Sequence, residues 1–231
     1  MTLLHSLSNL FFPPHCFSCN ERINDSAILC EKCSNELVGL KENSCVFCNK
    51  NTVNSFICEE CKQEYPFDEV VSVYTFNLPL QRMIHNFKYN EFKKIGTFLG
   101  YKLAEIISTY SFISNTDYII PVPLHRTKKR FRGFNQSEII AKALSTKLDI
   151  PILKNVLKRK KFTQTQTKLK KHEREKNVAN AFQVKNFGAI ENKSLLLVDD
   201  VLTTGSTMKS IALLLKENLA KHIYVCTLAR A

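Results

Sequence analysis

The segment 195–207 constrains the fold of this chain more than any other part of its sequence. It reads Leu-Leu-Leu-Val-Asp-Asp-Val-Leu-Thr-Thr-Gly-Ser-Thr. Four apolar residues at 195–198 predict a buried strand, and two carboxylates, Asp199 and Asp200, follow where we expect that strand to end. A short loop of Thr, Gly and Ser then turns into an apolar helix over 207–219. This order is typical of a ligand-binding edge in an α/β protein.

The loop has the composition of a phosphate site, formed by Thr203, Thr204, Gly205, Ser206 and Thr207. A helix N-terminus leaves backbone N–H groups free and carries partial positive charge, so it binds phosphate. The glycine would let the backbone approach the anion closely. The carboxylates suit sugar hydroxyls or Mg²⁺ instead, and a ligand with both a phosphate and a vicinal diol is a ribose phosphate. The alternative is an ordinary helix capped by a Thr or Ser side chain.

The whole stretch resembles the signature of type I phosphoribosyltransferases, which bind phosphoribosyl pyrophosphate (PRPP). It is not a nucleoside-triphosphate loop, because no Gly-Lys-Ser/Thr follows, and it is not a Gly-x-Gly-x-x-Gly dinucleotide turn. The hydrophobic pattern elsewhere alternates strands with helices, which predicts a parallel sheet flanked by helices. We expect strands at 70–76, 118–120, 182–184, 195–198 and 223–228, helices at 80–87, 92–109, 136–148 and 207–219, and a loop near 186–188.

The first sixty residues carry an internal repeat built on cysteine. Eight of the nine cysteines form four Cys-x-x-Cys pairs, and Cys-Phe-Ser-Cys-Asn at 16–20 matches Cys-Val-Phe-Cys-Asn at 45–49. Each pair places two sulfurs on one side, so two pairs close a tetrahedron around zinc and leave no open position. We therefore predict two structural zinc sites, one of Cys16, Cys19, Cys30 and Cys33 and the other of Cys45, Cys48, Cys58 and Cys61.

Other arrangements of these cysteines stay open at this point. The pairs could be cross-braced between the repeats, His15 could replace one thiolate, and disulfides or redox pairs are the alternative to metal. We expect zinc because cytosolic thiols stay reduced and no secretion signal is recognisable. So small a module has little core, and metal must supply much of its folding energy. Phe17, Phe47 and Phe56 either fill the small cores or stack on nucleobases. The ninth cysteine, Cys226, lies in an apolar run and is expected in the core.

The charge of the chain favours polyanionic partners. It carries 33 basic and 21 acidic residues, a formal net charge of +12, which becomes about +8 if each four-thiolate zinc site adds about −2. The cations are clustered at 126–132 and 154–176. A solvated face is the ordinary explanation of such a run, but two runs in a chain with a phosphate loop favour anion binding. No apolar run approaches the roughly 20 residues of a membrane helix, so we expect no membrane insertion.

Three segments lie outside the predicted core. Apolar residues at helical spacing in 1–12, without the features of a signal peptide, predict an amphipathic helix packed on the body. Tyr-Pro-Phe-Asp at 65–68 predicts a hinge between a zinc module over 1–64 and a phosphoribosyltransferase-like domain over 65–231. Residues 159–180 are crowded with Lys, Thr and Gln and lack an apolar period, which favours a mobile lid over an anionic ligand.

Further motifs extend the resemblance over nearly the whole length. Pro-Val-Pro-Leu-His at 121–125 precedes Arg-Gly-Phe-Asn-Gln at 132–136, and a Gln-x-x-Leu-x4-Arg-x-x-Asn pattern runs from Gln166 to Asn177. Together with the double cysteine module and Lys-Tyr at 88–89, these motifs resemble the ComF family of competence proteins. The resemblance implies a type I phosphoribosyltransferase fold with an N-terminal double zinc ribbon, a cytoplasmic location, and a role in handling incoming single-stranded DNA.

The resemblance also implies a role for each site residue. Backbone amides and hydroxyls of 203–207 would hold the 5-phosphate of PRPP, and Mg²⁺ would bridge pyrophosphate and ribose oxygens. Asp199 and Asp200 would bind the ribose hydroxyls and stabilise positive charge at the sugar carbon. The residues expected to clamp the pyrophosphate are Arg126, Arg132 and Lys88, and those expected to close as a lid are Gln166, Arg174 and Asn177.

Three functions are compatible with the sequence. The first is PRPP binding, with phosphoribosyl transfer to an acceptor that the sequence does not identify. The second is a non-enzymatic single-stranded DNA-binding module, in which the ribbons and basic runs follow the phosphates and affinity falls steeply with salt. The third is an adaptor whose ribbons dock a helicase or channel component of the DNA-uptake machinery. A PRPP-gated DNA-binding protein would combine the first two.

Overall fold

The computed structural model describes residues 13–23, 27–41, 43–53, 55–160 and 181–231. The helix expected over 1–12 and the lid residues Gln166, Arg174 and Asn177 lie outside the described residues.

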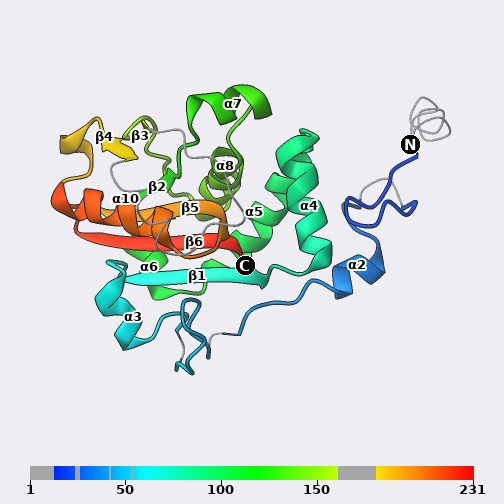
Figure 1. Ribbon diagram of the computed structural model, residues 1–231, viewed down its shortest axis with the longest axis horizontal. Coiled ribbons are helices and arrows are strands. Elements are labelled where there is room, and N and C mark those ends of the chain that lie inside the picture. Colours follow the sequence, from blue (N-terminus) through cyan, green and yellow to red (C-terminus); the bar gives the residue numbers. More distant parts are fainter. Residues whose placement is uncertain (1–12, 24–26, 42, 54, 161–180) are drawn as a thin grey trace.

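A four-stranded parallel sheet forms the centre of the molecule, in the order β1-β6-β5-β2 (Figure 1). Its strands are β1 (Glu69–Thr75), β2 (Tyr118–Pro121), β5 (Ser194–Leu202) and β6 (His222–Arg230). The two central strands are buried along most of their length, which explains their almost continuous apolar sequence. The parallel sheet confirms the predicted fold class.

Helices cover both faces of this sheet. The longer ones are α4 (Leu78–Tyr89), α5 (Lys93–Ile107), α8 (Gln136–Leu148) and α10 (Ser206–Glu217); the short ones are α2 (Glu31–Asn35), α3 (Glu59–Glu64), α6 (Ser111–Ser114), α7 (Arg126–Arg132) and the 3₁₀ turn η1 (Phe187–Ala189). Right-handed crossovers place α5 and α8 on one face and α10 on the other, as Figure 1 shows. Among the described residues, none of the helices is both long and apolar enough to cross a bilayer.

The helix predicted over 136–148 has the same bounds in the structure. The Asn135 side chain caps its N-terminus by accepting a hydrogen bond from the backbone N–H of Ser137, and Asp149 ends it with φ at 56°. One expected loop and the pairing of one expected strand differ from the prediction. The segment near 186–188 forms the 3₁₀ turn, and the strand at 182–184 is confirmed as β4 (Phe182–Val184) but pairs antiparallel with β3 (Leu157–Arg159), outside the parallel sheet.

The strand predicted to end at residue 198 is four residues longer. β5 continues to Leu202, so the two acids lie within the strand, and Asp199 is paired with Thr227 of β6. The apolar run could not reveal this extension, because the two acids interrupt it before the strand continues through Val201 and the buried Leu202, paired with β6.

The segment 65–68, where a hinge between the modules is predicted, is packed in this structure. Tyr65 and Phe67 are buried, and Asp68 accepts hydrogen bonds from the Ile223 amide and the Lys216 ammonium group. Residues 38–40 also pair with the sheet, since the Leu40 amide donates a hydrogen bond to the Val73 carbonyl. This segment therefore covers the outer edge of β1. The boundary at residue 64 stays a prediction.

Candidate functional site

The site lies at the carboxyl edge of the two neighbouring strands β2 and β5. Pro121 is in register with Val198, and the Val122 amide donates to the Val198 carbonyl at 2.9 Å. The segment 121–125 therefore lies beside the acidic pair, as the sequence predicted. Parallel strands place their carboxyl ends at one edge, which is where open α/β sheets bind ligands.

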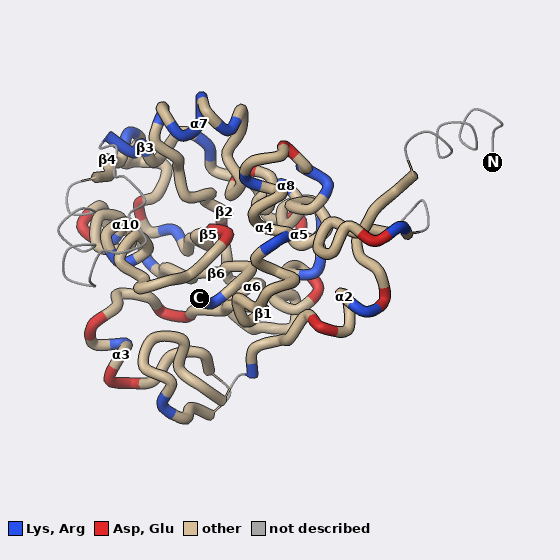
Figure 2. Tube along the Cα trace, turned by 45° about the vertical axis from the view of Figure 1, so that its right-hand side comes forward, with Lys and Arg blue, Asp and Glu red and all other residues tan. Residues whose placement is uncertain are grey.

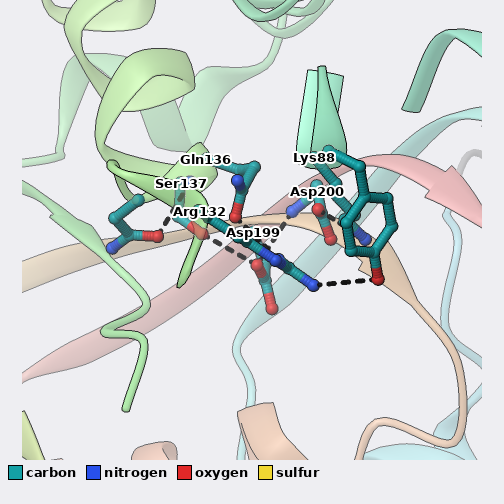
Figure 3. A network of polar contacts seen from close by, with 8 residues as sticks. Lys88, Arg132, Gln136, Ser137, Asp199 and Asp200 are labelled. Atoms are coloured by element: carbon teal, nitrogen blue, oxygen red, sulfur yellow. Dashed lines mark hydrogen bonds and ion pairs between the residues drawn. The ribbon is translucent and has the colours of Figure 1, made fainter. Parts of the chain in front are cut away.

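Each carboxylate of the pair is held by a different helix (Figure 3). Asp199 Oδ1 accepts hydrogen bonds from the Ser137 hydroxyl at 2.8 Å and from the Asp200 amide at 2.9 Å. Asp200 Oδ2 forms an ion pair with Lys88 Nζ at 2.7 Å, and both side chains are largely buried. The N-terminus of α8 and the C-terminal turn of α4 thus converge on β5.

The acidic pair is electrostatically unequal. Burial and the nearby Asp200 charge together raise the pKa of Asp199 to about 6, against the opposing effect of the hydrogen bonds from Ser137 and the Asp200 amide. Asp200 has Lys88 as its direct partner. A carboxylate whose pKa lies near neutrality is typical of functional sites.

Four cations surround this pair: Lys88, Lys128, Arg132 and Arg159. Burial and, to a smaller extent, the positive charges of Arg159, Arg132 and Lys88 together lower the pKa of Lys128 to about 8. Burial also lowers the pKa of Arg159, although the Asp199 charge opposes this. These mutual effects identify one cluster with more positive than negative charge.

The Arg132 guanidinium is fixed by three contacts. It donates to Gln136 Oε1 at 2.8 Å and to the Tyr89 hydroxyl at 3.4 Å, and it lies 5.2 Å from the centre of the Tyr89 ring. Figure 3 shows it above Asp199, so the motif at 132–136 provides both a cation and the residue that orients it. Among the described residues, Gln136 Nε2 is one of few buried polar atoms with no hydrogen-bond partner.

Only two of the three predicted clamp residues lie at the acidic pair. Lys88 and Arg132 reach the acidic pair, whereas Arg126 is exposed at the start of α7 and no polar contact among the described residues joins it to the acids. Sequence reasoning missed Lys128 and Ser137 as site residues. Helical spacing could have indicated Lys128, because residues 128 and 132 are one helical turn apart and share the less exposed side of α7.

The loop at 203–207 ends β5 and begins α10. Gly205 is the N-cap residue with φ at 74°, and the Thr204 hydroxyl accepts a hydrogen bond from the Ser206 amide at 3.4 Å, so a Thr side chain does contact the helix start. The hydroxyls of Thr204 and Ser206 share a hydrogen bond at 2.7 Å. The need for glycine at position 205 has a cause that differs from the predicted one. A Cβ atom there would lie 2.6 Å from Cε1 of Phe47, in the zinc module.

The cysteines group as the repeat predicts and not across repeats. Two clusters, one of Cys16, Cys19, Cys30 and Cys33 and one of Cys45, Cys48, Cys58 and Cys61, each hold their sulfurs within 4.8 Å of one another. Four sulfurs bound to a tetrahedral zinc at 2.3 Å lie about 3.8 Å apart. The Sγ atoms of Cys19 and Cys30 are 3.7 Å apart, and those of Cys48 and Cys58 are 3.6 Å apart. The clusters therefore fit structural zinc, and His15 belongs to neither of them.

The backbone conformation explains why an asparagine follows the second cysteine in both repeats. Asn20 and Asn49 follow the second cysteine of their turns and adopt φ of 64° and 61°, a left-handed conformation that Asn tolerates better than most residues. Their amides donate to the Cys16 and Cys45 carbonyls at 2.9 Å. Phe56 is buried, which favours the core role over base stacking for that residue.

Comparison with known proteins agrees with this architecture. A phosphoribosyl transferase domain matches residues 135–231, and a double zinc ribbon domain matches residues 7–62. Competence protein F of Haemophilus influenzae is 32% identical over 222 residues, which cover 87% of this chain and 96% of the relative. DNA utilization protein YhgH of Escherichia coli K12 is 30% identical, with 87% of this chain and 90% of the relative covered. Competence protein ComFC of Bacillus subtilis is 26% identical, with 88% and 84% covered.

These similarities extend over both the cysteine module and the sheet that carries the acidic pair. With 32% identity across almost the whole of competence protein F and matching zinc-ribbon and phosphoribosyl transferase domains, this chain belongs to the ComF family of competence and DNA-utilization proteins.

Proposed function

We propose that this chain binds PRPP with Mg²⁺ at the carboxyl edge of β2 and β5, and that it acts in the cytoplasm on single-stranded DNA. The observation that carries the binding proposal is the surplus of positive charge around the acidic pair. Burial and neighbouring cations lower the pKa of Lys128, which is unfavourable for the empty protein. A pyrophosphate group would neutralise this surplus with charge-assisted hydrogen bonds.

The order of groups along the site matches the order of groups in PRPP. The loop at 203–207 would take the 5-phosphate, Asp199 and Asp200 the ribose hydroxyls, and the cations the pyrophosphate. Mg²⁺ is usually held by one or two carboxylates together with ligand phosphates, which suits this acidic pair. The reaction class supported is displacement of pyrophosphate from the sugar carbon by an acceptor, with the carboxylates stabilising positive charge there.

Calorimetric titration of Mg-PRPP into the full chain tests this proposal. The variant Asp199→Asn/Asp200→Asn should weaken binding by at least about 100-fold, because two charge-assisted hydrogen bonds are lost. Lys94→Ala, which changes an exposed lysine of α5, is the control and should bind as the wild type does. Folded, zinc-loaded protein that gives no heat at millimolar Mg-PRPP would contradict the proposal.

The surface of α7 supports single-stranded DNA as a second ligand. The helix buries none of its seven residues, all within the described chain, and its Phe131 side chain is 79% exposed. Figure 2 shows the basic residues of α7 at the rim of the molecule. An exposed aromatic ring between cations is suited to stack on a base while the cations contact phosphates.

Fluorescence anisotropy with a labelled oligothymidine measures this activity. Phe131→Ala should weaken binding by about 5- to 100-fold, the range expected for one lost base–aromatic stack, with little change in salt dependence. Arg130→Ala should instead reduce the slope of log affinity against log salt by about 0.7. Phe187→Ala removes another exposed aromatic and serves as the control. Equal losses in the Phe131 and Phe187 variants would exclude α7 as the DNA-binding surface.

A further inference from the structure

We propose that the second zinc ribbon, residues 45–61, positions the loop at 203–207 through its Phe47 and through Tyr65, which follows the ribbon and stacks on Phe47. The proposal deepens the PRPP site and rests on it for the identity of the ligand. The two residues are positioning residues, because they contact the loop and not the expected ligand. Their effect is to give the loop one backbone conformation before the anion arrives.

The first observation is the space beside Gly205. A Cβ atom on this residue would lie 2.6 Å from Phe47 Cε1 and 2.9 Å from Tyr65 Cε1, both too short for real contacts. The φ of 74° also disfavours a side chain. The two rings therefore fill the space on one side of the loop, and only glycine lets them approach.

The second observation is a hydrogen bond that orients a peptide plane. The Tyr65 hydroxyl donates to the Thr204 carbonyl at 3.1 Å. In a trans peptide, the carbonyl and the next N–H point in opposite directions. Tyr65 thereby directs the Gly205 N–H away from the ribbon, toward the open side of the loop where a phosphate would accept it.

The third observation connects these rings to the metal cluster. Phe47 lies inside the turn between Cys45 and Cys48, so the ring position depends on the geometry of that turn. The ring stacks on Tyr65 with centres 3.9 Å apart and planes inclined by 14°. Arg230, near the end of β6, donates to the Val46 carbonyl and fixes the same turn to the sheet.

The contact between α10 and the ribbon continues one turn beyond the loop. Lys209 lies 5.3 Å from the centre of the Tyr65 ring and forms an ion pair with Glu64 at 3.5 Å. Cation–aromatic contacts of this kind contribute modestly at partly exposed sites. They keep the first turn of α10 aligned with the ribbon.

The first ribbon provides an internal comparison, because it also has two Cys-x-x-Cys pairs but packs against a different neighbour. Its Phe17 packs edge-on against Phe92 with ring centres 4.8 Å apart, and its carbonyl accepts a hydrogen bond from Asn86. These contacts lie on α4 and before α5, on the other side of the molecule from α3 (Figure 1). The two repeats therefore share a metal site but differ in the element that each supports.

Three variants of the full chain test the proposal. Phe47→Ala removes the stack, Tyr65→Phe removes only the hydroxyl, and Phe17→Ala is the matched change in the first ribbon. Zinc content and thermal unfolding are measured for each. We expect Mg-PRPP affinity to fall about three- to tenfold in Tyr65→Phe, the value of one neutral hydrogen bond, and at least as much in Phe47→Ala. Phe17→Ala should leave affinity unchanged.

A second measurement does not depend on PRPP. Amide hydrogen exchange at 203–209 in the absence of ligand should be faster in Phe47→Ala and Tyr65→Phe than in the wild type. If the wild type fails to bind Mg-PRPP, the proposed function fails, while the exchange rates still report whether the ribbon orders the loop. Unchanged exchange and unchanged affinity in a zinc-loaded Tyr65→Phe variant would overturn the positioning role.

A double-mutant cycle identifies the contact itself. Gly205→Ala should strongly impair binding in the wild-type background, because the new methyl group meets Phe47. In the Phe47→Ala background the same change should cause a smaller loss, since the closer of the two ring contacts is gone and only the Tyr65 contact and the backbone strain remain. Equal losses in both backgrounds would mean that Phe47 does not determine the requirement for glycine.

Discussion

At the scale of single residues, the site stores electrostatic strain. Asp199 is ionised only against the effect of burial and of its neighbour Asp200, and Lys128 carries its proton among three other cations. Such groups destabilise the empty protein and favour a ligand that complements them. Two predictions follow from the direction of these shifts.

The first concerns Asp199 and pH. Its folded pKa of about 6 lies above its ordinary value, so its contribution to stability is fully present below about pH 4 and is lost as pH rises through about 6. Asp199→Asn should therefore raise the unfolding free energy at pH 7.5 by about 1–2 kcal/mol, a value reduced for solvent screening. Denaturant unfolding at pH 5 and pH 7.5 checks this, and a difference that shrinks with rising pH would contradict it.

The second concerns protons taken up with the anion. Because the pKa of Lys128 is about 8, about half of these side chains are neutral at pH 8 in the empty protein. A bound anion raises that pKa, so binding of pyrophosphate should take up about half a proton per site. Calorimetry in buffers of different ionisation enthalpy measures the uptake. Lys128→Met should abolish it, and an unchanged uptake in this variant would assign it to another group.

At the scale of elements, the two zinc ribbons are similar units with different neighbours. Each holds four cysteine sulfurs at distances that suit zinc, and each places an asparagine in the left-handed conformation after its first pair. The repeat is visible in the sequence, but the aromatic residue is shifted by one position, from Phe17 to Phe47. The Phe17 ring packs against Phe92, whereas the Phe47 ring lies beside Gly205.

A matched pair of cysteine variants separates the two ribbons. Cys19→Ser and Cys48→Ser each remove the exposed second ligand of one cluster, and each should lower the bound zinc from about two ions to about one per chain. Mg-PRPP affinity should fall in Cys48→Ser and stay near the wild-type value in Cys19→Ser. Zinc analysis beside calorimetry provides both numbers. An equal loss of affinity in both variants would indicate a general effect on folding.

At the scale of the whole molecule, hydrogen bonds and buried side chains join the zinc module to the sheet. Residues 38–40 extend the edge of β1, and the second ribbon is fastened to β6 through Arg230. Buried rings of Tyr65 and Phe67 join the module to the sheet domain where a hinge was expected. The two parts should therefore unfold together.

Removal of zinc tests this continuity. A strong chelator should lower the melting temperature of the entire chain in one calorimetric transition, because the metal supplies folding energy to a module that is packed on the sheet. The matched control is chelator with excess zinc, which should restore the original transition. Two separate transitions, with the sheet domain unaffected by the chelator, would show that the module is an independent unit.

Much of the architecture was predictable from local sequence. Apolar runs located β1, β2, β5 and β6, the asparagine cap helped to fix α8, and the cysteine spacing located both metal clusters. The local pattern could not predict the extension of β5, because two acids interrupt the apolar run before the strand continues, paired with β6, to the buried Leu202. It also could not assign β4 to a separate hairpin, because the partner strand is only three residues long.

In the candidate site, too, some parts could be predicted from the sequence and others only from the fold. Its contiguous parts, the acidic pair and the loop at 203–207, were evident from sequence, because one strand and one turn contain them. Lys128, Arg159 and Ser137 come from other elements, and only the fold brings them beside Asp199. The sequence by itself determined the cysteine clusters, the parallel sheet and the turn at 203–207, because these depend on spacing along the chain. The tertiary structure alone decided which cations surround the acids and which ribbon contacts Gly205, because those contacts join residues far apart in sequence.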